Sequence, residues 1–139
     1  MILGIGTDVC DIRRIEKTLA RFGIRFIDRI FTNTEQSKAN QRKKPAYSYA
    51  QSFAAKEAFA KALGTGFRQG VFWRDIAVHN HSSGQPYLKI TGGAMAKLKE
   101  RIPVGMQSAI HITQTDEYPI ANAVVIIEAL PILLEARHP

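Results

Sequence analysis

Glu57 and Lys61 are the first residues whose type and spacing could do chemistry. They stand four positions apart in the stretch FAAKEAFAKALGTG of residues 53–66, which is rich in good helix formers. Both side chains should therefore lie on one face of a helix. An exposed glutamate and lysine at this spacing usually make only a weak surface contact. A reactive site would need a second carboxylate from elsewhere and a phosphate for the lysine to meet.

Asp8 is the candidate for that second carboxylate. It follows the apolar run ILGIG of residues 2–6, which has the composition of a buried strand. Gly4 and Gly6 would let another backbone or a ligand approach closely. Asp8 could equally be the N-cap of a following helix, because aspartate is a common N-cap residue. The residues alone leave both interpretations open.

The elements that must position these residues indicate an α+β domain. Helices are predicted at 11–21, 26–31, 46–63 and 94–101, with a weak turn at 34–35. Strands are predicted at 2–6, 75–80, 85–90, 108–113 and 120–128. The last strand is long and apolar, so it should be central in its sheet. Early helices and later hairpin strands favour a mainly antiparallel sheet packed on the long helix of 46–63.

Length and composition indicate one soluble domain. The 139 residues, 45% of them hydrophobic, can form a single ordinary core. We place the domain at residues 1–130 and a C-terminal tail at 131–139. The single Cys10 excludes an intrachain disulfide, and the N-terminus lacks the pattern of a signal peptide. No apolar run approaches the ~18–20 residues needed to cross a bilayer, so we expect a cytoplasmic protein without a membrane partner.

The net charge of +7 attracts anionic partners. Residues 13–29 carry a basic excess: Arg13, Arg14, Lys17, Arg21, Arg25 and Arg29 against Glu16 and Asp28. A one-signed stripe suits docking onto an acidic surface, although a charged helix face is often only solvated. Arg42, Lys43 and Lys44 are likewise either a solvated loop or a phosphate site. No nucleic-acid motif of recognised spacing appears, so nucleic acid is not expected as a partner.

Two further stretches allow more than one interpretation. Gly64, Thr65 and Gly66 form a flexible turn whose amides could bind an anion, but a helix C-cap explains Gly64 equally well. Phe72 and Trp73 could stack on a base, or they could serve the core or a subunit contact.

Three stretches taken together resemble the holo-[acyl-carrier-protein] synthases, the small bacterial group of 4'-phosphopantetheinyl transferases. They are GIGTD at 4–8, FAAKEAFAKALGTG at 53–66 and GQP at 84–86. The resemblance covers about residues 1–129. The first stretch alone would be a weak signal, whereas the intact pattern K-E-A-x-x-K-A-x-G-T-G in the second is highly specific.

The resemblance implies a homotrimeric enzyme with active sites in the clefts between subunits. Such an enzyme transfers 4'-phosphopantetheine from coenzyme A to a serine of apo-acyl carrier protein. Adenosine 3',5'-bisphosphate is released, and the product supports fatty acid biosynthesis. The resemblance also implies a magnesium ion held by Asp8 and Glu57. Acyl carrier proteins are acidic, and the resemblance implies that the carrier's helix beside the serine would meet Arg14, Arg21, Arg25 and Phe26.

These residue types are consistent with that chemistry. Two carboxylates from separate segments suit a magnesium ion that also binds phosphate oxygens. Lys61 would meet the coenzyme A pyrophosphate as a point charge. Glu57 is our candidate for the base that takes the serine proton, directly or through a metal-bound water. We therefore predict Asp8, Glu57 and Lys61 as the catalytic residues.

The sequence departs from the family's pattern at two places. Gln51 and Ser52 stand where relatives usually have an arginine before the Phe-Ala motif, and Gln114 ends a strand that often reads Ser-x-Ser-His. Both regions tend to contact coenzyme A phosphates or the adjoining cleft, so we expect the 3'-phosphate to be held by basic residues of the 42–44 loop instead. The predicted coenzyme A site consists of Lys61, Gly64, Thr65, Gly66, Arg42 and Lys44.

A different class of function would be a non-enzymatic basic module that binds acidic protein or RNA. The charge would permit such a module. It gives no reason, however, for Asp8, Glu57 and Lys61 to occur together in this pattern.

Overall fold

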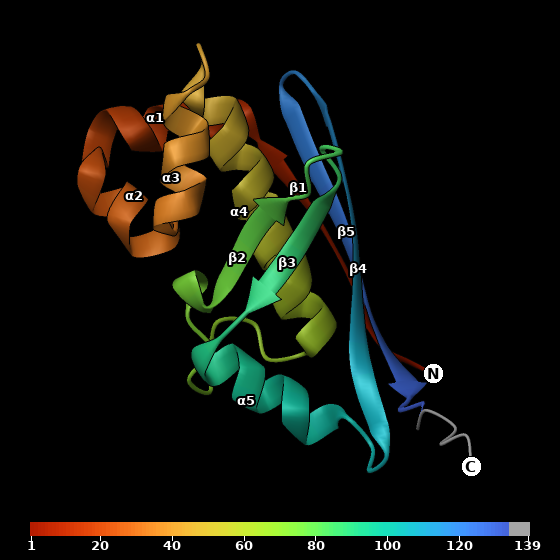
Figure 1. The fold of residues 1–139 in the computed structure, drawn as a ribbon. Coiled ribbons are helices and arrows are strands. Elements are labelled where there is room, and N and C mark those ends of the chain that lie inside the picture. Colours follow the sequence, from red (N-terminus) through yellow and green to blue (C-terminus); the bar gives the residue numbers. More distant parts are fainter. Residues whose placement is uncertain (134–139) are drawn as a thin grey trace.

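The computed structural model of the chain describes residues 1–133, with the long helix α4 (Pro45–Leu63) at its centre (Figure 1). The elements before it are β1 (Ile2–Asp11), α1 (Ile12–Phe22), α2 (Ile24–Ile30) and α3 (Asn33–Asn40). Those after it are the 3-10 turn η1 (Trp73–Asp75), β2 (Ile76–Asn80), β3 (Pro86–Ile90), α5 (Gly92–Arg101), β4 (Met106–Glu117) and β5 (Ile120–Pro131).

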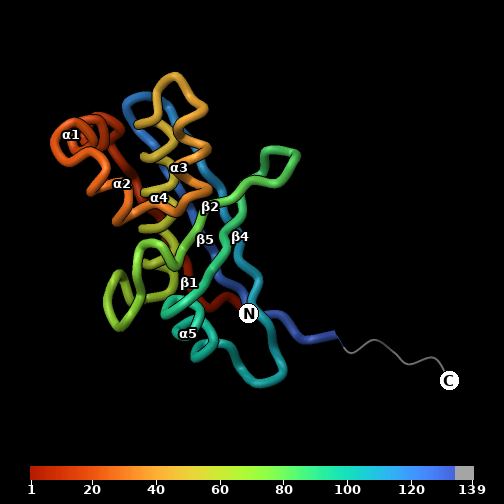
Figure 2. Tube along the Cα trace, turned by 60° about the vertical axis from the view of Figure 1, so that its left-hand side comes forward, coloured from red at the N-terminus to blue at the C-terminus, as the bar shows by residue number. Residues whose placement is uncertain are grey.

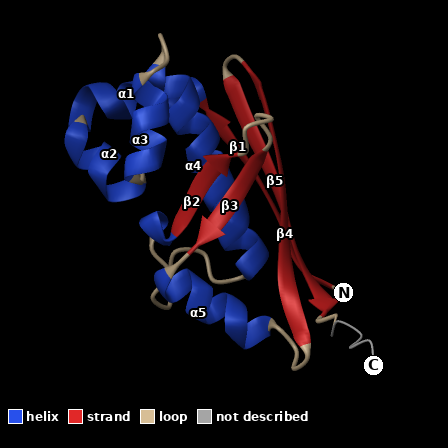
Figure 3. Cartoon of the chain, in the orientation of Figure 1, coloured by secondary structure: helices blue, strands red, loops and turns tan. Residues whose placement is uncertain are grey.

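Two antiparallel sheets contact α4. The larger has the strand order β1-β5-β4, and the smaller is the β2-β3 hairpin. α4 packs on one face of the larger sheet, while α1, α3 and β2 contact other sides of the helix (Figures 1 and 3). The turn between β2 and β3 projects from the body (Figure 2). The predicted α+β domain, with its last strand central, is confirmed.

α4 is buried on most of its sides, and its composition suits this position. Small side chains that are fully buried let the neighbouring elements approach closely: Ala50, Ala54, Ala55 and Ala58. Pro45 occupies the first turn, where its missing N–H costs nothing, and Gly64 ends the helix with φ 87°. Arg101 of α5 donates hydrogen bonds to the carbonyls of Ala62 and Leu63, at the C-terminal end of the helix, at 2.9 and 2.7 Å.

Where β1 crosses α4, the two main chains are in direct contact. A Cβ atom added to Gly4 would lie 1.9 Å from the carbonyl oxygen of Ala62, and one added to Gly6 would lie 1.9 Å from that of Ala58. No side chain fits at either position. Glycine is therefore required for this crossing, which fixes where β1 lies along α4 and so where the side chain of Asp8 falls.

Replacing Gly6 with alanine should destabilise the fold by at least about 1–3 kcal/mol, because the new methyl group meets a backbone oxygen that cannot rotate away. Urea unfolding at fixed protein concentration measures this loss. Gly84, with no atom within 4 Å of an added Cβ, provides the packing control, although its φ of 91° adds backbone strain. An unfolding free energy for Gly6→Ala equal to the wild-type value would contradict the close crossing.

Several element boundaries differ from the sequence prediction. β1 continues to Asp11, so Asp8 lies inside a strand and is not an N-cap; Asp11 caps α1 instead, accepting a hydrogen bond from the backbone N–H of Arg13 at 2.9 Å. The predicted weak turn near Glu35 is the helix α3. β4 and β5 are also longer than predicted.

The end of the chain can be compared only in part. β5 extends to Pro131, one residue into the predicted tail, and residues 134–139 of that tail lie outside the described residues. Among residues 1–133, no helix is both long and apolar enough to cross a membrane.

Candidate active site

A hollow of about 290 Å³ opens where β1, α1, α2 and α4 meet. Its walls consist of Asp8, Val9, Cys10, Arg14, Ile15, Thr18, Phe26, Phe53 and Glu57. Asp8 and Glu57 come from segments almost fifty residues apart in the sequence, and the glycine crossing of β1 over α4 brings them to the same hollow.

Lys61 lies next to this pair of carboxylates and forms an ion pair with Asp8. Its Nζ lies 3.1 Å from Asp8 Oδ1 and donates a hydrogen bond to the carbonyl of Thr7 at 3.0 Å. The lysine side chain remains 54% exposed, so it can still turn toward a ligand. The structure therefore brings together Asp8, Glu57 and Lys61, the three residues predicted to be catalytic.

The Glu57 carboxyl has a pKa above its ordinary value of 4.5, first because burial disfavours its charge and second because Asp8 is close; Lys61 opposes both effects. Although Lys61 and Arg14 are also close, Asp8 and Glu57 still repel each other, and a cation between the two carboxylates would offset this repulsion. Within residues 1–133, no group of three His, Cys, Asp or Glu side chains suits a metal ion. An ion here would thus take only two protein ligands and fill its shell with water and phosphate oxygens, as Mg²⁺ commonly does.

Cys10 lines the same hollow but is not suited to covalent chemistry. Burial, and then the nearby Asp8, raise the pKa of the Cys10 thiol to about 11. A thiol in this state is neither a nucleophile nor a ready metal ligand at neutral pH. Cys10 is instead a buried part of the core.

A second hollow of about 340 Å³ adjoins the first. It is lined by Thr18, Phe22, Arg25, Phe26 and Arg29, and it shares Thr18 and Phe26 with the hollow of Asp8 and Glu57. Of the residues predicted to meet a partner, Arg14, Arg25 and Phe26 therefore border the two hollows. The guanidinium of Arg21 lies 5.0 Å from the ring centre of Phe22, on the rim.

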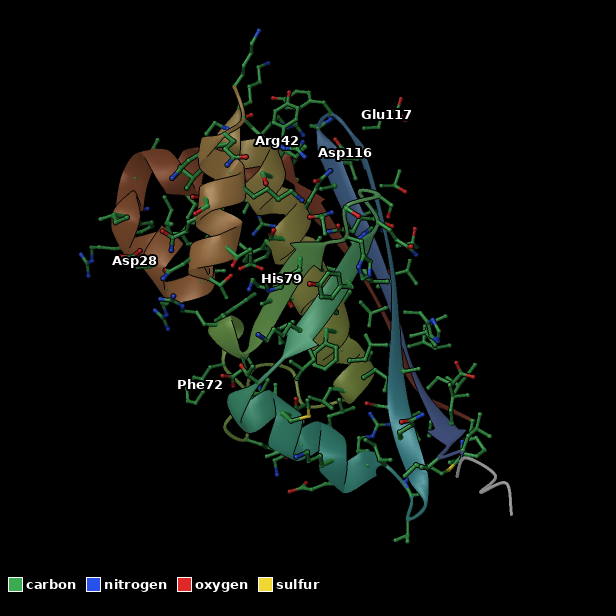
Figure 4. The ribbon with its side chains drawn as sticks, viewed as in Figure 1. Asp28, Arg42, Phe72, His79, Asp116 and Glu117 are labelled. Carbon is green, nitrogen blue, oxygen red and sulfur yellow. The ribbon has the colours of Figure 1, made fainter. Side chains whose placement is uncertain are left out.

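The residues predicted to hold coenzyme A divide into two groups at opposite ends of α4. Gly64, Thr65 and Gly66 follow the helix, just beyond Lys61, whereas Arg42 and Lys44 precede it. At a rise of 1.5 Å per residue, Lys44 and Lys61 are separated by about 25 Å along the helix axis. One chain therefore does not bring both groups to a single phosphate cluster. Figure 4 shows Arg42 near the N-terminal end of α4.

The two departures from the family's pattern contact each other. Gln114 of β4 donates a side-chain hydrogen bond to the backbone carbonyl of Gln51 at 2.9 Å, and the Gln51 side chain donates to Asp116 Oδ1 at 2.7 Å. Gln51 and Gln114, which depart from the family's pattern, thus form one set of polar contacts between α4 and β4.

The sequence analysis missed a buried ion pair next to the site. Lys56 Nζ lies 2.8 Å from Glu35 Oε1, and both side chains are almost fully buried. Two signals were available: a lysine in the apolar stripe of the long helix, and the capping-box spacing of Thr32 and Glu35. Because consecutive helix residues point in different directions, Lys56 reaches the α3–β2 side while Glu57 reaches β1.

Comparison with known proteins agrees with this geometry. The model of the 4'-phosphopantetheinyl transferase superfamily matches residues 4–123. The chain belongs to this family. It is 59% identical to a holo-[acyl-carrier-protein] synthase of Brucella ovis over 133 residues, which are 96% of this chain and 99% of the relative.

Solved structures of this family share the fold. The holo-[acyl-carrier-protein] synthase of Neisseria meningitidis is 39% identical with a TM-score of 0.80, covering 92% of this chain and 99% of that protein. The synthase of Bacillus anthracis, solved in complex with CoA (3',5'-ADP), is 32% identical with a TM-score of 0.74, covering 91% and 96%. The resemblance inferred from the three sequence stretches is confirmed.

Proposed function

We propose that this protein transfers 4'-phosphopantetheine from coenzyme A to a serine of apo-acyl carrier protein, giving holo-acyl carrier protein and adenosine 3',5'-bisphosphate. The observation that carries the proposal is the meeting of Asp8 and Glu57 at one hollow, with Lys61 paired to Asp8, in a chain 59% identical to a holo-[acyl-carrier-protein] synthase. The product would serve fatty acid biosynthesis, in the cytoplasm.

Asp8 and Glu57 would hold a magnesium ion in this reaction. When bound, the ion offsets charge that develops on the leaving phosphate during in-line displacement. The residues fit it because Asp8 raises the pKa of the Glu57 carboxyl, and a cation between the two would relieve that repulsion. Lys61, already beside Asp8, would release it to contact the pyrophosphate.

The carrier supplies the attacking serine, so this chain needs only a proton acceptor and a surface that orients the hydroxyl. Glu57 is the acceptor that we propose, directly or through a water, because its raised pKa brings it nearer to a working base. Arg14 lies at the same hollow and is exposed. Arg14, Arg21, Arg25 and Phe26 would orient the carrier.

We propose that the chain works as a homotrimer that associates through the face of the large sheet that α4 does not cover. On this face Ile5 pairs with Ile126, and Ile5 and Val9 are each 62% exposed. The separation of Arg42 and Lys44 from Lys61 supports a site shared between subunits, since the 3'-phosphate and the pyrophosphate belong to one nucleotide. Native mass spectrometry tests this; a monomeric mass at micromolar concentration would contradict it.

Arg14→Glu should raise the KM for the carrier about tenfold or more while leaving the KM for coenzyme A unchanged, because a like charge would then face an acidic partner at the hollow. The rate of carrier association should also lose most of its salt dependence. Steady-state kinetics over a range of salt concentrations measure both effects. Lys89→Glu, an exposed change on β3, is the charge-matched control. An unaltered KM for the carrier would remove Arg14 from the docking surface.

The decisive experiment combines the purified protein, coenzyme A, magnesium and an apo-acyl carrier protein, and weighs the carrier by intact mass spectrometry. The expected result is a gain of one phosphopantetheine group, abolished by EDTA and by Asp8→Ala. A carrier of unchanged mass with several different carriers would overturn the proposal. Transfer that persists in EDTA would overturn only the metal requirement.

A further inference from the structure

Phe72 lies outside the site described above and is 68% exposed, although phenylalanine is normally buried. It immediately precedes η1, where its backbone N–H donates a hydrogen bond to Asp75 Oδ2 at 3.1 Å. In Figure 4 its side chain points away from the body, on the side opposite β4 and β5. An exposed aromatic ring on an ordered turn is typical of residues that anchor protein interfaces.

A third hollow, of about 400 Å³, lies beside Phe72. It is lined by Arg29, Phe67, Val71, Phe72, Trp73 and Arg74. This hollow shares Arg29 with the second hollow, which in turn shares Phe26 with the hollow of Asp8 and Glu57. The three hollows therefore adjoin one another, and a path of mixed aromatic and basic side chains leads from the carboxylates to Phe72.

A stack of aromatic rings connects the same two regions from within. Trp73 packs against Phe53, with ring centres 5.0 Å apart, and against Phe67, with ring centres 3.6 Å apart. Phe53 lines the hollow of Glu57, whereas Phe67 lines that of Phe72. Phe72 is next to Trp73 in the sequence, and Trp73 stacks on Phe53, which lines the hollow of Glu57. A partner bound at that hollow would therefore also reach Phe72, because each partner of an ordinary protein interface buries about 800 Å².

The charge around Phe72 is mainly positive. Arg29 and Arg74 line its hollow, and Arg25 lines the adjoining one. Arg74 is held in place by hydrogen bonds to the Asp28 carbonyl at 3.2 Å and to Asn33 Oδ1 at 3.3 Å. The exposed carboxylate of Asp28 is the one nearby acid on α2. Three arginines against two aspartates, Asp28 and the Asp75 that accepts the hydrogen bond from Phe72, leave a net positive charge that favours an acidic partner.

We propose that Phe72, together with Arg29 and Arg74, forms a second docking point for the acidic carrier protein, beyond the surface of α1 and α2. This inference rests on the proposed function and extends its docking surface. The occupant is the carrier rather than a second copy of this chain, because another chain of net charge +7 would bring like charge to a basic surface. The exposed apolar face of the large sheet, on the opposite side, is the place for self-association.

Phe72→Ala tests this proposal by steady-state kinetics with coenzyme A saturating and the carrier varied. We expect the KM for the carrier to rise about tenfold, which is the usual loss for an interface anchor, with kcat and the KM for coenzyme A unchanged. Phe72→Leu, which keeps an apolar side chain, should recover most of the loss. Val104→Ala is the control, because Val104 is also exposed but lies between α5 and β4.

The other possible results of this experiment contradict either the second docking point or the proposed function. A KM for the carrier equal to that of the wild type in Phe72→Ala, with an active wild-type protein, overturns the second docking point and leaves the proposed function intact. A smaller oligomer in Phe72→Ala would assign the surface to a second copy and likewise overturn the proposal. A wild-type protein that transfers nothing to the carrier overturns the proposed function itself.

Discussion

Glu57→Gln should abolish phosphopantetheine transfer, with turnover at least about a thousand-fold below that of the wild type. The amide has the size of the carboxylate but can neither take the serine proton nor offer a charged ligand to a magnesium ion. The fold should persist, because the substitution removes a partly buried charge next to Asp8. Intact-mass assays of the carrier over extended incubation measure the residual rate.

Binding of Mn²⁺, followed by electron paramagnetic resonance, separates the two roles of Glu57. If the residue is a metal ligand, Glu57→Gln loses Mn²⁺ affinity together with activity; if it is only the base, the affinity remains. Glu100→Gln serves as the matched control, because the Glu100 side chain is 64% exposed on α5. Turnover by Glu57→Gln near the wild-type rate would exclude both roles.

Lys56→Met should destabilise the protein by about 3–5 kcal/mol, the usual cost of leaving one partner of a buried ion pair uncompensated. Glu35 would keep the N–H donors of Thr32 and Val78 but lose the ammonium group 2.8 Å away. The carbonyls of Trp73 and Ile76 would also lose their donor. Urea unfolding at fixed protein concentration measures the change.

The double variant Glu35→Gln with Lys56→Met sharpens this test. It removes both charges, so it should be more stable than Lys56→Met alone. Together with the single variant Glu35→Gln, it completes the double-mutant cycle that gives the coupling between the two residues. Lys97→Met, at a surface lysine paired only with Glu100, should change stability by no more than about 0.5 kcal/mol. A Lys56→Met protein as stable as the wild type would mean that the buried pair is dispensable.

The elements with strong local signals were predictable from the sequence. The helix of α4, with its proline start and glycine stop, lies within one residue of the prediction, and the β2-β3 hairpin matches closely. α3 was not recognised because its residues, NTEQSKAN, are polar and have low helix propensity. Its stability comes from the Thr32 cap and from Glu35 contacting Lys56, twenty-one residues away, which no local window contains.

The site was predictable as a set of residues but not as an arrangement. The K-E-A-x-x-K spacing identified Glu57 and Lys61. Asp8 was a candidate from its place after the first strand, and the family resemblance favoured a metal ligand over an N-cap. That Lys61 pairs with Asp8 depends on how β1 crosses α4, a long-range contact that neither segment encodes alone. The exposure of Phe72 is likewise a tertiary property, because nothing in its sequence neighbourhood distinguishes it from Trp73, which is partly buried in an aromatic stack.

The crossing of β1 over α4 also makes the spacing of the two carboxylates independent of the choice of carrier protein. Since it is a contact between main chains, the spacing of Asp8 and Glu57 does not depend on side chains of α1, α2 or η1. Those three elements carry the surfaces proposed for the carrier. Substitutions there, at positions that do not line the hollow of Asp8 and Glu57, can change which carrier is preferred without disturbing the carboxylate pair. A new protein substrate is therefore accessible to evolution, or to design, through surface changes alone, with the reactive centre inherited intact.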